Sequence, residues 1–98
     1  MTDSVVTRNE AASRYEVHVD GALAGISDFV QGEGSVVFTH TETFPQFSGQ
    51  GLGLALTKAA VADAVARGEA ITPVCPFVRR YLERNDVPGA VVLWPPSE

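Results

Sequence analysis

Hydrophobic and polar residues alternate in the first half of the chain in a way that predicts an antiparallel meander. Residues 15–19 alternate apolar and polar side chains, the pattern of a strand with one buried face. An Asp-Gly pair then favours a tight hairpin turn into a returning strand at residues 23–30. A second turn containing two glycines leads into a third strand at residues 35–43. We therefore expect three consecutive antiparallel strands.

The third predicted strand carries polar groups at its far end. Strict alternation places Val36, Phe38, His40 and Glu42 on one face. His40 and Glu42 then lie side by side where the strand ends, within reach of one bound molecule.

The next segment predicts a helix. Residues 54–67 are rich in Ala and Leu, which favour helices, and Leu54, Val61 and Val65 fall on one stripe. We expect this stripe to face the core.

The remainder of the chain predicts a strand, a second helix and a final strand. Residues 70–74 suit a short buried strand, but Pro73 cannot donate a ladder hydrogen bond, which indicates a bulge, an edge or a place where neighbouring strands part. Residues 76–84 begin with a proline and suit a helix, and residues 90–94 suit a last strand with Trp94 as a core anchor. The expected fold class is α+β with a mixed sheet.

The length and net charge limit the classes of protein to which this chain can belong. The 98 residues fit one domain, residues 1–98, and 45% hydrophobic with 19% charged residues is typical of a globular protein. The net charge is 7 − 12 = −5, which provides no basic surface for a phosphate backbone. We expect no nucleic-acid partner.

Cysteine usage indicates the compartment. Cys75 is the only cysteine and therefore forms no disulfide within the chain, and with His18 and His40 as the only histidines a Cys/His zinc cluster is excluded. A reducing, cytoplasmic setting is the simplest interpretation, and we expect no bound metal. The sequence shows neither a secretion signal nor an apolar run long enough to span a bilayer, so we expect no membrane association.

Three glycines at alternate positions lie between the third strand and the first helix: Gly49, Gly51 and Gly53. Glycine allows close approach of a ligand to the backbone, and the free N–H groups of a following helix suit a pyrophosphate. A plain strand-to-helix turn is the alternative. The dinucleotide-binding fingerprint and the P-loop pattern both fail, because the required glycine spacing and the Gly-Lys-Ser/Thr triplet are missing.

The wider stretch HTETFPQFSGQGLGLAL at 40–56, followed by ITPVCPF at 71–77, resembles the GNAT superfamily of acyl-CoA N-acetyltransferases. It looks most like the small single-domain branch, the YjdJ-like, NATD-type proteins, and the similarity covers residues 15–87. In the superfamily pattern Arg/Gln-x-x-Gly-x-Gly/Ala, the glycines correspond to Gly51 and Gly53, but Ser48 stands at the Arg/Gln position.

The resemblance implies a minimal GNAT fold that binds acetyl-CoA (coenzyme A) in a V-shaped cleft between the strands at 35–43 and 70–74. Backbone groups of Thr43 and Phe44 would pair with the pantetheine amides, as an added strand does. The loop would hold the pyrophosphate. The implied cofactor-binding residues are Thr43, Phe44, Ser48, Gly49, Gln50, Gly51, Leu52, Gly53 and Leu54.

Four residues are candidates for catalysis. Cys75 precedes Pro76 at a helix start, where the dipole favours a thiolate, so it suits a nucleophile or proton relay; the alternative is a small buried hydrophobe. Tyr81 corresponds to the superfamily tyrosine that protonates the departing CoA thiolate, and the alternative is a core aromatic. His40 and Glu42 suit proton acceptors for an amine; the alternative is a structural or merely exposed role.

The function that these residues support is transfer of an acetyl group from acetyl-CoA to an amine of unknown identity. A small amine and a protein or peptide amine fit equally. The alternative is a non-catalytic CoA-binding or interaction module with the same fold, because Ser48 departs from the superfamily pattern.

Overall fold

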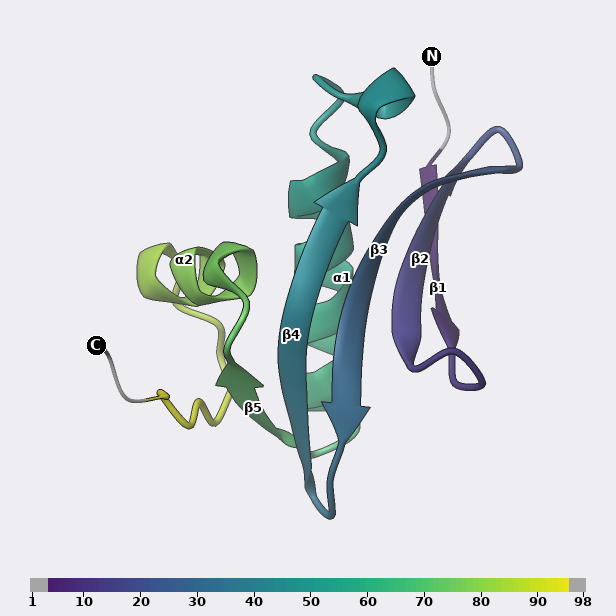
Figure 1. The fold of residues 1–98 in the computed structure, drawn as a ribbon. Helices are drawn as coiled ribbons and strands as arrows, with labels where there is room; N and C mark the ends of the chain where they lie inside the picture. The colour runs from purple at the N-terminus through teal and green to yellow at the C-terminus, as the bar shows by residue number, and fades with distance from the viewer. Residues whose placement is uncertain (1–3, 96–98) are drawn as a thin grey trace.

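Five strands form one mixed sheet in the computed structural model, which describes residues 4–95 (Figure 1). Neighbouring strands follow one another in sequence, the first four are antiparallel and the last pair is parallel. The strands are β1 (Ser4–Asn9), β2 (Arg14–Val19), β3 (Ala22–Gln31), β4 (Ser35–Thr43) and β5 (Ala70–Pro73). The α+β class and the predicted meander are confirmed.

Strand β1 was not predicted. It pairs with β2 in register from Ser4 opposite Val19 to Asn9 opposite Arg14, and its Val5 is half exposed. As an edge strand, β1 has one partner and little buried surface, so it lacks the alternation that marks the other strands.

Two helices cover one face of the sheet. Helix α1 (Leu52–Ala66) connects β4 to β5 and lies behind the sheet in Figure 1, and α2 (Pro76–Arg84) follows β5. The opposite sheet face carries no helix in the described part of the chain. Neither helix is long and apolar enough to cross a membrane.

The buried face of α1 differs from the predicted stripe. Leu56, Ala60, Val61 and Ala64 are buried against the sheet, whereas Leu54 is 56% exposed. The predicted core position of Leu54 is therefore wrong. The helix starts two residues earlier than expected, and Leu52 rather than Leu54 enters the core from its first turn.

Residues 90–94 do not form the predicted strand. The segment makes a single bridge, between Val92 and Ile71, with Ile71 N–H donating to Val91 O and Leu93 N–H donating to Ile71 O. Trp94 is 49% exposed, so its predicted role as a core anchor is also wrong.

Candidate functional site

Strands β4 and β5 part halfway along β4. The parallel pairing runs from Ser35 opposite Ala70 to Phe38 opposite Pro73, and the last backbone hydrogen bond is the Cys75 N–H donating to Phe38 O at 2.8 Å. Beyond it the chain turns into α2, so the remaining edge of β4 has no strand partner among the described residues. The predicted parting at Pro73 is confirmed.

A β-bulge at Thr39 reverses the alternation of side chains in β4. Thr39 has no partner on β3, because the register shifts by one residue there. One extra residue moves every later side chain to the other face. His40 and Glu42 therefore point to the helix-free face, opposite to Val36 and Phe38, and the prediction that these four share a face is wrong.

The bulge also decides which backbone groups face the unpaired edge. The N–H of Phe44 donates to Ala24 O of β3 at 2.8 Å. Because backbone groups alternate along a strand, those of Thr41 and Thr43 point away from β3. The Phe44 N–H is therefore already occupied, whereas the backbone groups of Thr43 and Thr41 face the unpaired edge.

The glycine loop ends in an open helix start. Gly49 and Gly51 have φ angles of 82° and 71°, in the left-handed region that favours glycine. A Cβ atom added at either residue would meet nothing within 4 Å, so the backbone faces open space. No side chain caps α1, and no hydrogen bond within residues 4–95 satisfies the N–H groups of residues 49–54. Such a row of free N–H groups suits an anion.

The third glycine has a different role from the first two. Gly53 is buried, and a Cβ there would lie 2.7 Å from Cζ of Phe77. Its lack of a side chain lets α2 pack against α1. Ser48 and Gln50 are exposed at the edge of the loop, and neither side chain makes a hydrogen bond to a described residue.

Cys75 is the N-cap residue of α2 and is 3% exposed. Its thiol donates a hydrogen bond to Oγ1 of Thr41 at 3.4 Å, and that hydroxyl also lies 3.1 Å from Oγ of the buried Ser27. Cys75 packs in the same core as Val78 and Leu82. Cys75 is therefore buried, as the alternative interpretation expected, and it lies where β4 and β5 part.

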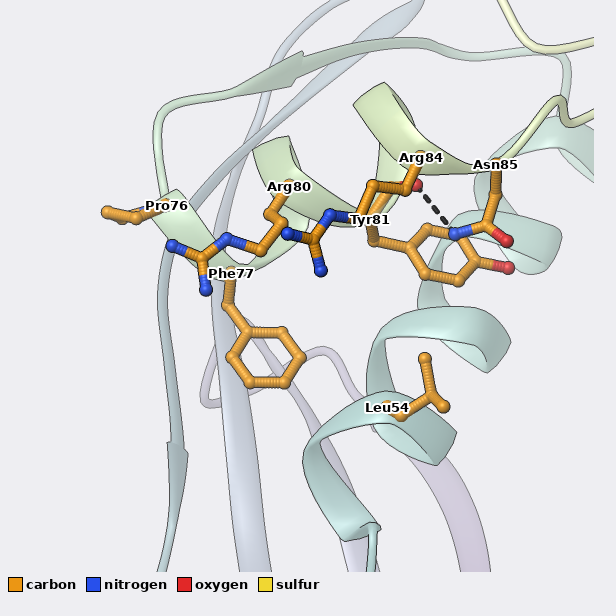
Figure 2. A pocket seen from close by; sticks show the side chains of 7 residues that line it. All are labelled: Leu54, Pro76, Phe77, Arg80, Tyr81, Arg84 and Asn85. Carbon is orange, nitrogen blue, oxygen red and sulfur yellow. Dashed lines mark hydrogen bonds between the residues drawn. The ribbon is translucent and has the colours of Figure 1, made fainter.

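Tyr81 lines a cavity of about 350 Å³ between α1 and α2 (Figure 2). Leu54 of the first turn of α1 and Phe77 form its apolar wall, and Arg80 and Arg84 extend along one side. The Tyr81 ring packs partly against the core, while its hydroxyl has no hydrogen-bond partner among the described residues. Leu54 is therefore a cavity residue.

His40 and Glu42 form an exposed pair, with Nε2 of His40 lying 3.2 Å from Oε1 of Glu42. Their predicted proximity is confirmed. They lie on the helix-free face, whereas Cys75 and Tyr81 lie on the helix side. The structure thus groups the predicted catalytic residues into two sets on opposite sides of the β4 edge.

Sequence reasoning missed Thr41, Arg80 and Arg84. The bulge that turns Thr41 toward Cys75 leaves no pattern in the sequence, because it arises from backbone pairing. The i, i+4 spacing of the two arginines on a predicted helix was a readable signal. No group of three His, Cys, Asp or Glu residues that could hold a metal occurs within residues 4–95.

Comparisons with known proteins agree with this geometry. A family model described as GCN5-related N-acetyl-transferase matches residues 14–89. A comparison with curated proteins gave no match. Among solved structures, the chain is similar to the solution structure of a GCN5-like candidate N-acetyltransferase from Staphylococcus aureus, with a TM-score of 0.69 and 21% identity over 98% of this chain and 94% of that one.

At that identity the solved structure shows the fold alone, whereas the family model spans most of the chain. The chain therefore belongs to the GCN5-related N-acetyl-transferase family.

Proposed function

We propose that the protein binds acetyl-CoA and transfers the acetyl group to an amine. The observation that carries the proposal is the row of free N–H groups at residues 49–54, at the same end of the molecule as the unpaired edge of β4 (Figure 1). An anion site beside an open strand edge suits a ligand that joins a diphosphate to a chain of amides.

The loop and the strand edge have separate tasks in binding. The N–H groups of residues 49–54 would hold the diphosphate at the positive end of α1. The outward backbone groups of Thr41 and Thr43 would pair with the pantetheine amides as an added strand does. The cofactor-binding roles first assigned to Gln50, Leu52 and Leu54 then reduce mainly to backbone N–H groups, whereas the Ser48 N–H already donates to Pro45 O.

The two sets of side chains suit the two proton transfers of a direct reaction. The amine nitrogen forms a bond to the acetyl carbon while the carbon–sulfur bond breaks. His40 or Glu42 accepts the proton that the amine loses on the helix-free face, and the Tyr81 hydroxyl donates a proton to the leaving thiolate on the helix side. A backbone N–H of β4 polarises the carbonyl.

Burial of Cys75 favours this direct route over a covalent acetyl-cysteine. A nucleophilic thiol must reach the thioester carbon, but the Cys75 thiol is 3% exposed and donates to Thr41. Cys75 and Thr41 act on this view as positioning residues that hold the start of α2 against the bulged part of β4.

The proposal also names the charge of the acceptor amine, the branch of the family and the cellular compartment. A protein with a net charge of −5 favours a cationic acceptor over an anionic one. The proposed compartment is the cytoplasm. The acceptor can be a small amine or a protein amine. The mutual coverage of 98% and 94% with a small solved relative supports placement in the small single-domain YjdJ-like, NATD-type branch.

Two measurements test the proposal. Acetyl-CoA at 100 times its Kd should stabilise the folded protein by about 2.7 kcal/mol, seen as a rise in melting temperature. A panel of amines should then show acceptor-dependent release of free CoA thiol. No thermal shift at millimolar acetyl-CoA would refute binding, and a shift without thiol release for any amine would favour the non-catalytic CoA-binding module.

A further inference from the structure

Two arginines of α2 lack a carboxylate partner in an otherwise acidic protein. The chain has seven Lys and Arg residues against twelve Asp and Glu residues. The arginines that form ion pairs within residues 4–95 are Arg8, Arg14, Arg67 and Arg79. Arg80 and Arg84 make none, although Glu83 lies between them and pairs instead with Arg79 at 3.4 Å.

Both unpaired arginines line the same cavity. Arg80 and Arg84 are one helical turn apart, and Figure 2 shows their guanidinium groups directed to the same side of α2, above Phe77. Like charges at this spacing repel each other. Two neighbouring cations that share a cavity and have no acidic partner form a suitable site for a doubly charged anion.

The cavity connects this pair of cations with the anion loop. Its opposite wall is Leu54, which belongs to the first turn of α1 and directly follows the free N–H groups of the loop. The apolar side chains of Leu54 and Phe77 lie between the loop and the two arginines, whereas the Tyr81 hydroxyl is directed away from them (Figure 2). A matching ligand has one phosphate group at the loop, a flat or apolar part over Leu54 and Phe77, and a second phosphate at the two arginines.

We propose that Arg80 and Arg84 bind the 3′-phosphate monoester of the CoA nucleotide. This inference rests on the proposed function. A phosphate monoester carries close to two negative charges at neutral pH, and arginine binds phosphate through paired N–H groups. The two arginines thereby select acetyl-CoA over its 3′-dephospho form, which keeps the diphosphate, the pantetheine and the thioester.

Calorimetry with both ligands at one salt concentration tests the selection. We expect the wild-type protein to bind acetyl-CoA at least about tenfold more tightly than acetyl-3′-dephospho-CoA, as for charge-assisted contacts. The double variant Arg80→Gln/Arg84→Gln should bring this ratio close to one while leaving the Kd for the dephospho ligand unchanged. Arg79→Gln, on the same helix but paired with Glu83, is the matched control and should keep the wild-type ratio.

The other outcomes overturn the inference, and they show whether the proposed function also fails. Equal wild-type affinity for the two ligands rejects it and leaves the proposed function standing. An equal loss for both ligands in the double variant assigns the arginines to the shared part of the ligand and also rejects it. Binding of neither ligand by the wild-type protein rejects the proposed function itself. Melting temperatures without ligand verify that the variants fold.

Discussion

The Cys75 thiol donates a hydrogen bond to the Thr41 hydroxyl at 3.4 Å across the point where β4 and β5 part. This contact joins the start of α2 to the bulged half of β4. Since the same hydroxyl lies 3.1 Å from Oγ of Ser27, three polar side chains from three elements meet inside an otherwise apolar core. Buried polar groups that satisfy one another fix the relative position of their elements.

Replacement of Cys75 by alanine should keep most of the acetyl transfer. In the direct reaction the thiol only positions α2, so we expect a loss of less than about tenfold in kcat for Cys75→Ala. Tyr81→Phe should cost more, about 100-fold, because it removes the proton donor of the leaving thiolate. Thiol release with a single acceptor measures both. Loss of all activity in Cys75→Ala with a folded protein would contradict the direct route in which the thiol only positions α2.

Substitution of Glu42 should slow transfer without weakening acetyl-CoA binding. The carboxylate lies beside His40 on the helix-free face and does not line the cavity between the helices. We expect Glu42→Gln to lower kcat by about 100-fold when it removes the proton acceptor for the amine, with an unchanged Kd for acetyl-CoA.

Glu33→Gln is the matched control, since Glu33 is exposed in the turn between β3 and β4 at the other end of the strand. It should behave like the wild-type protein. Equal activity of Glu42→Gln and Glu33→Gln would show that the Glu42 carboxylate has no role in the transfer.

Introduction of arginine at position 48 should tighten acetyl-CoA binding. Ser48 is exposed, has extended backbone angles that arginine adopts without strain, and lies three residues before Gly51. We expect Ser48→Arg to lower the Kd up to about tenfold by a charge-assisted contact to a diphosphate. Ser48→Glu, measured by calorimetry at the same salt concentration, should raise it. Identical Kd values for all three proteins would mean that residue 48 lies outside the binding site.

Much of the fold could be predicted because its elements carry clear periodic signals. The predicted strand at 35–43 and helix at 76–84 coincide with β4 and α2, and the helix predicted at 54–67 overlaps α1. The glycines also marked the region of the open helix start, although α1 begins two residues earlier than expected. These features depend on local sequence.

Features that depend on pairing across the sheet were not predictable in the same way. The bulge at Thr39 moves the side chains of all later β4 residues to the other face of the sheet, and no residue in that strand indicates a bulge. Val91, Leu93 and Trp94 suggested a strand, but the segment makes only one bridge with Ile71 and leaves all three side chains about half exposed. An apolar run therefore did not distinguish a core strand from a covering segment.

Gly25 of β3 should not tolerate a side chain. A Cβ there would lie 2.7 Å from the backbone oxygen of Glu42 and 3.4 Å from Cα of Thr43, so Gly25→Ala would push β4 away at the proposed binding edge. We expect a loss of about 2 kcal/mol or more in the free energy of unfolding. Urea denaturation provides the measurement.

Gly53→Ala is the comparison for this experiment. Its Cβ would meet only the outer edge of the Phe77 ring, which is 46% exposed and can move. The expected loss is therefore below about 1 kcal/mol, partly offset by the higher helix propensity of alanine. A larger loss for Gly53→Ala than for Gly25→Ala would contradict the predicted order.

A buried tyrosine joins the edge strand to α1. The Tyr15 hydroxyl donates to Oδ2 of Asp63 at 2.7 Å and accepts from a guanidinium N–H of Arg8 at 2.7 Å. Burial, followed by the hydrogen bond and negative charge of Asp63, raises the pKa of Tyr15 to about 12. Both effects favour the neutral hydroxyl in the folded protein.

The raised pKa predicts a loss of stability at alkaline pH. An unfolded chain ionises tyrosine near pH 10, so the stabilising contribution is complete below about pH 10 and is lost as the pH rises through about 12. Tyr81→Phe leaves Tyr15 as the only tyrosine, and its tyrosinate absorbance should rise with a midpoint near pH 12. Tyr15→Phe should remove that part of the pH dependence of unfolding. A Tyr15 midpoint near pH 10 in the folded Tyr81→Phe variant would contradict the raised pKa, because only an exposed hydroxyl without the Asp63 contact titrates there.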